Sequence, residues 1–429
     1  MSAGAKPERA GSNRLPDRPL DEPADALGTV RLTGRLGSAL IYDKMVDRVL
    51  GRRPRDGDLV QILDSEEKPA GWGLYNVRSG IRVRRMSRRA AAPDSAWWAA
   101  RIDDALAFRR STIADVMASS RQVGQKVYGP AYRVIHAEGD GLPGLIVDRY
   151  DDTLSVEAFS LGLHQRIGPI VRLLEERLGT KHWIVRFDER AARAEGVTPQ
   201  EHRSPDCPKR AMVQEDGVLF LVDFETGHKT GFFCDQRENR MKLAASSAGK
   251  TLLDVCCYTG GFGLVGGRDA KQVTMVDLDE KAVALAEENA KINQHFGAKS
   301  KFKFVQADAF NYMRQLDFDG QRFDVVVLDP PKLIGSRAEF EDGRRKYSDL
   351  NTLAMKLVEP GGLLVTHSCS GLMVEAEFQK VLKVASWRSG REFRIERFAG
   401  AAVDHPVRVD VPESSYLKSV WLRRTGEED

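Results

Sequence analysis

The chain is poor in cysteine, and its few cysteines form no recognisable framework. Its 429 residues include 5 cysteines, among them the adjacent Cys256 and Cys257, and no CxxC pair with zinc-site spacing. These absences argue against a disulfide scaffold and a structural zinc site, so we expect no metal and a reducing, cytoplasmic location. No apolar run approaches the roughly 18 residues that a membrane helix needs, so no membrane association is expected.

An excess of one charge sign is also absent. The sequence holds 65 basic and 62 acidic residues, which leaves a formal net charge of +3. This balance excludes a general polycation, so any contact with nucleic acid must come from a local basic patch. The length predicts about two or three domains, and 42% of hydrophobic residues can build a core in each.

The first residues carry neither a signal peptide nor a folding pattern. Residues 1–28 lack the apolar segment of a secretory signal and are rich in proline, charge and small side chains, so we predict disorder there. Short strand patterns with turn signals between them follow, and they indicate a small β-barrel. The predicted strands cover residues 29–32, 59–63, 70–75 and 81–84.

Arginines gather at the end of this barrel segment. Arg82, Arg84, Arg85, Arg88 and Arg89 all fall between positions 82 and 89. A charged edge strand that resists aggregation would have this composition. A strand that contacts nucleic-acid phosphates would have it too, and the side chains at 82 and 84 would then share a face. Both interpretations stay open from the residues alone.

The middle of the chain indicates a second, small α/β segment. Helical spacing of apolar residues predicts helices at 97–120 and near 163–178, and apolar runs such as 154–158 predict strands. A stretch rich in proline, glycine and charge at 196–209 marks the boundary with the last domain. A hairpin formed by 218–223 and 227–233 is expected to follow that boundary.

From residue 234 onward, predicted strands alternate with predicted helices. Such alternation is typical of a parallel sheet with helices on both faces. Asp279 is a suitable N-cap for one of these helices. The predicted strands cover 251–256, 273–277 and 302–306 and two runs that end at Asp329 and His367, and the predicted helices cover 235–245, 279–293 and 309–316.

A glycine-rich turn follows the first strand of this alternation. Asp254 lies near the end of the strand, and the turn Tyr258-Thr259-Gly260-Gly261-Phe262 would let backbone approach a ligand closely. The spacing differs from the G-x-G-x-x-G pattern of dinucleotide sites. An acid at this place suits the amino group of a methionine moiety better than it suits a pyrophosphate.

Two further acids end the next two strands. Asp277 is placed to accept both ribose hydroxyls, a feature that nicotinamide sites share. Asp308 is placed to accept the exocyclic amine of adenine, although a helix cap alone would also explain it. Acids on three successive strand ends with one glycine-rich turn form the arrangement of class I methyltransferases, so we predict S-adenosylmethionine (SAM) as the cofactor.

The last two parallel strands end in residues suited to pyrimidine chemistry. Asp329-Pro330-Pro331-Lys332 ends one, and Cys369 follows the other. Amino-group methyltransferases often have an aromatic residue where Lys332 stands, so an exocyclic amine is the less favoured acceptor. Carbon 5 of a pyrimidine becomes nucleophilic when a thiolate adds to C6. Cys369 is placed for this addition, and Asp329 is placed to hold the N3/N4 edge of the base.

Less active roles for the same residues stay open. Cys369 could be an inert buried thiol, which is the usual state of a free cysteine. His367 could lower the pKa of this thiol, move a proton, or only pack in the core. The base that removes the C5 proton is open among His367, His405 and Glu413.

Several strings in order resemble the bacterial 23S ribosomal RNA cytosine-C5 methyltransferase family, that is, ribosomal RNA large subunit methyltransferase I and its relatives. The resemblance spans roughly residues 55–425. The matching strings are 138–145 (EGDGLPGL), 229–240 (KTGFFCDQRENR), 258–262 (YTGGF), 329–332 (DPPK), 368–373 (SCSGLM), 404–406 (DHP), 412–413 (PE) and 416–418 (YLK).

The resemblance implies a fold and a set of site residues. The implied fold class is α/β, with an N-terminal PUA-like β-barrel, a small central α+β domain and a C-terminal Rossmann-like class I methyltransferase domain. Cys369 would be the nucleophile and Asp329 would lie beside the base. Gln236 and Arg237 would join the cofactor site. The residues implied or proposed to bind the substrate are Pro330, Pro331, Lys332, Arg82 and Arg84.

Together these arguments predict a SAM-dependent RNA methyltransferase that forms 5-methylcytosine in ribosomal RNA. Methylation of a guanine nitrogen or of uracil C5 is the enzymatic alternative, and a non-catalytic RNA-binding assembly factor is the other. Ribosomal RNA is the expected partner, and a homodimer is one oligomeric state left open. The expected domains are a disordered segment at 1–28, a PUA-like domain at 29–95, a central domain at 96–208 and the methyltransferase domain at 209–429.

Overall fold

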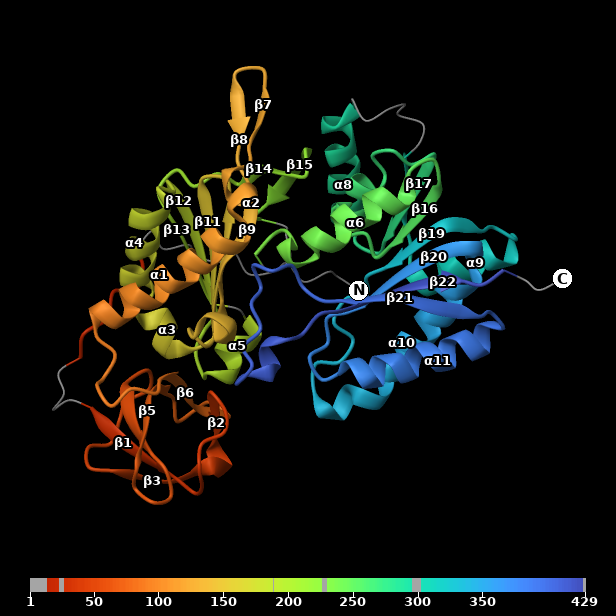
Figure 1. The fold of residues 1–429 in the computed structure, drawn as a ribbon. Helices are drawn as coiled ribbons and strands as arrows, with labels where there is room; N and C mark the ends of the chain where they lie inside the picture. Colours follow the sequence, from red (N-terminus) through yellow and green to blue (C-terminus); the bar gives the residue numbers. More distant parts are fainter. Residues whose placement is uncertain (1–13, 23–26, 188, 226–229, 295–301, 427–429) are drawn as a thin grey trace, which may run out of the picture. The chain divides into compact units, whose positions relative to one another are not determined.

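The computed structural model describes residues 14–426 except 23–26, 188, 226–229 and 295–301 (Figure 1). These residues form two compact units. Unit 1 takes the chain up to Ala211, with Thr230, Gly231 and the distant segment Val403–Ser414, and unit 2 takes the remainder. The described part of the chain contains no helix with the length and hydropathy that crossing a membrane requires.

Unit 1 opens with a six-stranded sheet in the order β2-β6-β5-β4-β1-β3. β1 and β4 are parallel, and the other neighbours are antiparallel. Alternate side chains such as Val30, Ile62 and Val83 are fully buried in a common core, which the two-residue period of a strand explains. The elements are β1 (Gly28–Leu32), β2 (Leu40–Tyr42), the 3-10 helix η2 (Asp43–Met45), β3 (Val46–Leu50), β4 (Leu59–Leu63), β5 (Pro69–Tyr75) and β6 (Ile81–Ser87).

Part of the segment that was predicted to be disordered is ordered against unit 1. Arg18 donates to Gln165 Oε1 at 2.8 Å and to Asp58 Oδ1 at 2.6 Å, and Leu20 is buried. Residues 14–22 therefore differ from the expectation, because their side chains find partners on a folded surface that composition does not show. Residues 1–13 and 23–26 lie outside the described residues.

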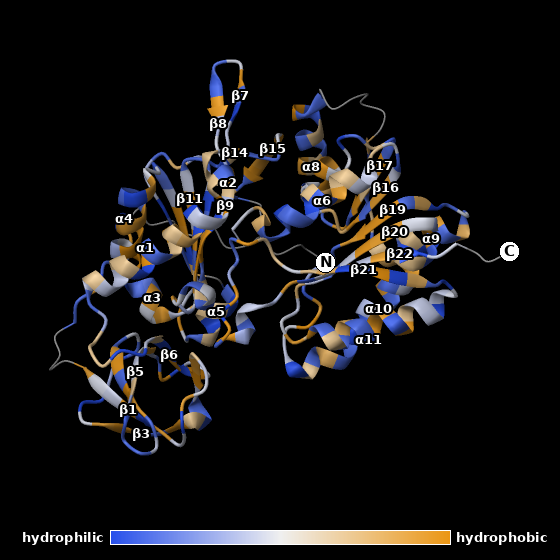
Figure 2. Cartoon of the chain, in the orientation of Figure 1, coloured by the Kyte–Doolittle hydropathy of each residue, from blue (hydrophilic) through white to orange (hydrophobic). Residues whose placement is uncertain are grey.

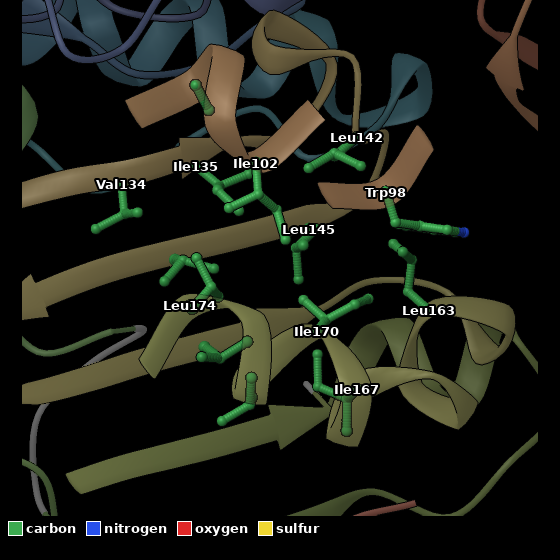
Figure 3. Close-up of a cluster of buried hydrophobic side chains, with 14 of the residues drawn as sticks. Trp98, Ile102, Val134, Ile135, Leu142, Leu145, Leu163, Ile167, Ile170 and Leu174 are labelled. Atoms are coloured by element: carbon green, nitrogen blue, oxygen red, sulfur yellow. The ribbon is translucent and has the colours of Figure 1, made fainter. Parts of the chain in front are cut away.

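The second part of unit 1 is a five-stranded sheet in the order β13-β12-β11-β10-β9. Figure 3 shows Trp98 and Ile102 of α1, Ile170 and Leu174 of α4, and Leu145 of β10 gathered in one apolar cluster. The elements are α1 (Ser95–Thr112), α2 (Ala114–Ala118), β7 (Arg121–Val123), β8 (Lys126–Tyr128), β9 (Ala131–His136), η3 (Ala137–Asp140), β10 (Leu145–Tyr150), β11 (Thr153–Ala158), α3 (Leu161–Gln165), α4 (Ile167–Leu178), β12 (His182–Phe187), α5 (Glu189–Ala194) and β13 (Gln200–Arg203).

The segment Val403–Ser414 belongs to unit 1, although it was expected in the methyltransferase domain at 209–429. Asp404 accepts the backbone N–H of Arg133 at 2.9 Å, and its carbonyl oxygen accepts Arg109 Nη2 at 2.7 Å. The rings of His405 and His136 lie 5.1 Å apart. These contacts join residues far apart in the sequence, so a boundary read along the chain could not include them.

Unit 2 contains a seven-stranded sheet in the order β18-β17-β16-β19-β20-β22-β21. The strands from β18 to β20 are parallel, whereas β22 is antiparallel to both of its neighbours. The strands and α-helices are α6 (Arg237–Ser247), β16 (Thr251–Val255), α7 (Gly261–Gly266), β17 (Gln272–Asp277), α8 (Glu280–Ile292), β18 (Phe302–Gln306), α9 (Ala309–Phe318), β19 (Phe323–Leu328), α10 (Phe340–Lys356), β20 (Val358–Ser368), α11 (Glu375–Ser389), β21 (Phe393–Ala399) and β22 (Lys418–Arg424). The remaining short helices are η4 (Cys234–Gln236), η7 (Arg337–Glu339) and, in unit 1, η8 (Pro412–Ser414).

Helices cover both faces of this sheet, as the alternation predicted. α6 and α8 lie on one face, and α10 and α11 lie on the other (Figure 1). The middle strands are mostly hydrophobic (Figure 2), because a parallel strand between two helix layers is buried on both faces. The predicted N-cap is confirmed, since Asp279 accepts the backbone N–H of Lys281 at 2.9 Å.

One predicted pairing is wrong. Among the described residues, β15 (Val218–Asp223) pairs with the preceding strand β14 (Arg210–Glu215) and with no strand after it. The turn Asp216-Gly217 has positive φ at both residues, which suits a two-residue hairpin turn and explains the pairing. Part of the partner that we expected, residues 226–229, lies outside the described residues, and Gly231–Phe233 form no strand.

Candidate active site

The strand order of unit 2 creates a switch point between β16 and β19. From these two neighbours the chain continues to β17 on one side and to β20 on the other, so their loops diverge at the carboxyl edge of the sheet. Val255 pairs with Leu328, and the backbone N–H of Asp329 donates to Val255 O at 3.2 Å. Asp254 and Asp329 therefore lie at the place where ligands of such sheets bind.

Asp254 has one carboxylate oxygen that the protein leaves unpaired. The side chain is fully buried, and its Oδ2 accepts the backbone N–H of Gly263 at 2.7 Å. Its Oδ1 finds no hydrogen-bond partner among the described residues. Burial raises the pKa of Asp254 to about 8, and the nearby Asp329 and Asp277 add to this rise. A buried orphan oxygen in an acidic surrounding fits a cationic ligand group, such as the amino group of SAM.

The turn after β16 is held in an unusual backbone conformation. Cys256 and Tyr258 have positive φ values of 62° and 49°, and Gly260 has 84°. A Cβ on Gly260 would also approach Met275 Sδ and Ala286 Cβ to 3.2 Å. Both the positive φ and this lack of space favour glycine at position 260. The Thr259 carbonyl accepts Asn289 Nδ2 at 3.1 Å, and this bond holds the turn against α8.

Asp277 is oriented by two backbone donors. Its Oδ2 accepts the N–H of Tyr258 at 2.8 Å, and its Oδ1 accepts the N–H of Asp279 at 3.0 Å. Asp308 caps α9 by accepting the N–H of Asn311 at 3.0 Å. The capping role considered for Asp308 is therefore present, and it leaves a carboxylate with further acceptor capacity. Parallel pairing of β16, β17 and β18 brings the acids at 254, 277 and 308 to one edge.

Gln236 reaches the same edge from the start of α6. Its Nε2 donates to Asp329 Oδ2 at 3.1 Å, and its Oε1 accepts Asn239 Nδ2 at 2.7 Å. Arg237 is buried with its Nε 3.9 Å from Glu215 Oε2. Glu215 also forms a two-bond ion pair with Arg240. Gln236 thus orients a carboxylate of the site, whereas Arg237 lies with the buried ion pair that anchors α6.

Cys369 follows β20 and is half-buried. The next residue, Ser370, ties its loop to three other elements. Ser370 Oγ accepts the N–H of Ile334 at 3.1 Å and contacts the hydroxyl of Tyr347 at 3.0 Å, and its carbonyl accepts Lys418 Nζ at 2.6 Å. Ile334 follows the 329–332 string, so the loops that carry Asp329 and Cys369 are joined directly.

Lys418 was not predicted as a site residue, although it lies in one of the matching strings. It is 8% exposed and donates to the carbonyls of Ser370 and Tyr416, each at 2.6 Å. Burial lowers the pKa of Lys418 to about 8; a thiolate at Cys369 opposes this shift and Lys332 adds to it. Only the pairing of Ser368 with Lys418 across β20 and β22 brings this ammonium to the thiol.

His367 is a packing residue in this structure. It is fully buried, and its ring lies 5.0 Å from that of Phe262. Neither ring nitrogen has a hydrogen-bond partner among the described residues, and burial lowers the pKa of His367 to about 3. A ring that stays neutral and enclosed favours the packing interpretation. His405 and Glu413, the other candidates for the proton acceptor, belong to unit 1.

The residues predicted to bind substrate differ in their surroundings. Pro330 is buried, whereas Pro331 and Lys332 are exposed beside the site. In unit 1, Arg82 pairs with Asp43, and Arg84 donates to the carbonyl of Phe159 at 3.0 Å. Both arginines are therefore used within the fold, which favours the structural interpretation for these two positions.

Two family models match the chain. Residues 180–379 match the model of S-adenosylmethionine-dependent methyltransferases, and residues 35–88 match that of a PUA-like domain. These matches confirm the predicted fold class, with its PUA-like domain, and SAM as the cofactor.

Curated relatives match nearly the whole chain. A protein of Aeromonas hydrophila subsp. hydrophila named ribosomal RNA large subunit methyltransferase I is 37% identical over 389 residues, which cover 89% of this chain and 94% of that protein. A protein of the same name from Vibrio vulnificus (strain YJ016) is 36% identical over 384 residues, which cover 88% and 93%.

Solved structures share the fold over most of its length. SMU.776, described as a candidate methyltransferase in complex with SAH, superposes with a TM-score of 0.75 at 19% identity and covers 90% of this chain and 96% of its own. A candidate SAM-dependent methyltransferase from Streptococcus mutans gives a TM-score of 0.76 at 19% identity and covers 92% and 99%. At this level of identity the likeness concerns the fold.

Proposed function

We propose a specific reaction for this chain, which belongs to the ribosomal RNA large subunit methyltransferase I family and is a SAM-dependent methyltransferase of large-subunit ribosomal RNA. The reaction is transfer of a methyl group to C5 of a cytosine in 23S ribosomal RNA through a covalent bond between Cys369 and C6. One observation carries this proposal. The loops of Asp329 and Cys369 leave neighbouring parallel strands and are joined through Ser370 and Ile334.

The acids at the strand ends would hold the cofactor. Asp254, with its orphan oxygen, would pair with the amino group, Asp277 with the ribose hydroxyls and Asp308 with the adenine amine. The Tyr258–Phe262 turn would lie along the cofactor at the same edge, because it follows β16 directly and Gly260 and Gly261 present bare backbone there. When bound there, SAM supplies an electrophilic methyl group.

The protein would activate the pyrimidine in two steps. The Cys369 thiolate forms a bond to C6, and the electrons of the C5–C6 double bond move so that C5 becomes enamine-like. A protonated Asp329 would donate a hydrogen bond to N3, where negative charge builds up, and its other oxygen would accept a hydrogen bond from the N4 amino group. Gln236 would keep this carboxyl in place through its 3.1 Å bond.

The remaining steps restore the aromatic ring. C5 would bond to the methyl group while the bond between that methyl group and sulfur breaks and leaves its electron pair on sulfur, and a base would then remove the C5 proton. The electrons of that C–H bond reform the double bond while the C6–S bond breaks, so Cys369 leaves as a thiolate. Lys418, held behind the Cys369 loop by two carbonyls, would stabilise this thiolate before addition and after elimination.

Replacement of the nucleophile tests the mechanism. The Cys369→Ala variant should lose more than about a thousandfold in methyl transfer to 23S RNA from deletion cells, while SAM affinity by calorimetry stays within about twofold. Cys207→Ala is the matched control, because Cys207 is also a half-buried cysteine but lies in unit 1. Undiminished turnover by Cys369→Ala would refute the assignment.

The identity of the base is tested on the product. Mass spectrometry of nucleosides should find 5-methylcytidine. Bisulfite sequencing should show one cytosine that is protected from conversion, and this protection should be lost in cells without the gene. RNA carrying 5-fluorocytidine should trap a covalent complex at Cys369, since fluorine cannot leave as a proton does. A methylguanosine or 5-methyluridine product would overturn the choice of base. Absence of SAM binding would favour the non-catalytic assembly factor.

A further inference from the structure

A pocket in unit 1 has no role in the reaction described above. Its volume is about 220 Å³, and residues of β6, α1, η3 and the segment Val403–Ser414 line it. Five of the lining residues are arginines, and the acids in the lining are Glu138 and Asp410. With five guanidinium groups and two carboxylates, the wall carries an excess of three positive charges. The arginines are Arg85, Arg88, Arg89, Arg101 and Arg408.

Asp410 neutralises only part of this charge. It accepts Arg88 Nη2 at 2.5 Å and also pairs with Arg408, whose Nε and Nη2 lie at 3.0 and 2.8 Å. One carboxylate is thus shared between two guanidinium groups. Arg101 pairs with Asp104, an exposed carboxylate one helical turn away that does not line the pocket.

Arg85 is the buried member of this set, and of the two acids in the lining only Asp410 acts on its charge, at a distance. It is 9% exposed, and its guanidinium forms no ion pair or hydrogen bond with any residue of the described part of the chain. Burial lowers the pKa of Arg85, and repulsion from Arg88 adds to this effect. A buried guanidinium without a partner is unfavourable unless an anion binds to it.

We propose that this pocket binds a phosphodiester group of the RNA substrate. Guanidinium groups form paired hydrogen bonds to phosphate oxygens, and Arg85, Arg88 and Arg89 offer them from a single strand end. The volume is roughly seven times the share of one liquid water molecule, about 30 Å³, so a phosphate and part of its ribose fit. Met86, Pro143 and Val411 supply apolar wall that suits a sugar ring better than a bare ion.

The proposal divides the basic run at 82–89 into two parts. Arg82 and Arg84 have partners within the fold, whereas Arg85, Arg88 and Arg89 face the pocket. It rests on the proposed function only in that the substrate is RNA. It requires neither a particular methylated atom nor a cysteine adduct.

The test is the affinity of the full-length protein for a labelled 23S RNA fragment, measured by fluorescence anisotropy at several salt concentrations. Arg85→Gln should weaken binding by about tenfold, the effect of losing a charged hydrogen bond. It should also lower the steepness of the salt dependence by about 0.7–0.9, the contribution of one phosphate contact. Arg35→Gln is the matched control, because Arg35 lies in the same domain with a 79% exposed side chain and pairs with Glu66. The control should change affinity by less than about twofold.

Two further variants keep the test independent of folding. Arg88→Gln removes a side chain that is 58% exposed, so the variant should fold and still bind RNA more weakly. Asp410→Asn removes a negative charge from the wall and should strengthen RNA binding by up to about fivefold. A purely structural role for these residues would not produce a gain. An unchanged salt dependence in Arg85→Gln and Arg88→Gln would overturn the proposal.

Inorganic phosphate separates the two sources of this ligand chemistry. If it binds wild type but not Arg85→Gln in calorimetry, while RNA affinity is the same for both, the pocket holds a free phosphate compound and the RNA proposal fails. The proposed function is judged separately, by the product and the Cys369 adduct. Loss of RNA binding in Arg85→Gln together with full activity in Cys369→Ala would support the phosphate site and refute the cysteine mechanism.

Discussion

Replacing Asp254 by asparagine separates the stability of the free protein from its affinity for the cofactor. Asp254 is fully buried, accepts the N–H of Gly263 at 2.7 Å, and has a second oxygen without a partner among the described residues. Asparagine has nearly the same shape, and its carbonyl oxygen can keep the bond to Gly263. The substitution therefore removes the ability to carry a negative charge and replaces the unpaired oxygen by an amide NH2 group.

The effect on stability follows from the pKa of this carboxyl group. Burial raises the pKa from 3.8 to about 8, so the folded protein holds the proton more tightly than the unfolded chain does. Asp254 therefore does not reduce the free energy of unfolding below about pH 4, and it reduces this free energy progressively as the pH rises from about 4 to about 8. At about 1.4 kcal/mol per pH unit, the loss has an upper limit of about 4 kcal/mol at pH 7 and about 6 kcal/mol at pH 8.

The asparagine variant lacks this loss, so without SAM it should be more stable than wild type. The difference should be small at about pH 4 and should grow up to about pH 8, which calorimetric unfolding at several pH values would measure. SAM should bind the variant about 10- to 100-fold more weakly, because a charged hydrogen bond to its amino group is lost.

A matched control exists on the next helix. Asp279→Asn replaces one good N-cap residue by another at α8, so stability, its pH dependence and SAM affinity should all stay close to wild type. The reasoning is refuted if Asp254→Asn is less stable than wild type near pH 8, or if it binds SAM equally well. The first result would mean that burial of the charged carboxylate does not destabilise the free protein, and the second would mean that the orphan oxygen does not mark a cation site.

Two further substitutions test the surroundings of Cys369. Lys418→Met should lower kcat and move the acid limb of the pH–rate profile upward by about one pH unit, because the Lys418 ammonium, below its pKa of about 8, favours the Cys369 thiolate. SAM affinity should not change, and Lys418→Arg should restore part of the rate. An unmoved pH–rate profile would exclude this role for Lys418. His367→Leu should keep kcat within about threefold of wild type, because the ring is neutral and packed on Phe262; a loss of about a hundredfold with normal SAM binding would instead identify a proton carrier.

The local features of unit 2 could be predicted because short-range patterns specify them. Buried apolar runs between helical segments located β16 to β20, and an aspartate before a helix located the cap of α8. Parallel strands bring their carboxyl ends to one edge, so the sequence alone groups the acids at 254, 277 and 308. The same logic placed Asp329 and Cys369 on neighbouring strands.

Features that depend on contacts between distant residues could not be predicted. The antiparallel β22 lies between β20 and β21, and this order alone brings Lys418 to the Cys369 loop. Likewise, the segment Val403–Ser414 joins unit 1, where Asp410 and Arg408 complete the arginine pocket begun by β6.

The amino-acid sequence by itself determined the domain types, the cofactor and the residues that end each strand, because each of these depends on side chains close together along the chain. The tertiary structure decided which charges have partners. Asp254 Oδ1 and the Arg85 guanidinium are left without partners among the described residues, whereas Arg82 and Arg84 are not. Pairing of buried charges depends on packing across many residues, and no local pattern encodes it.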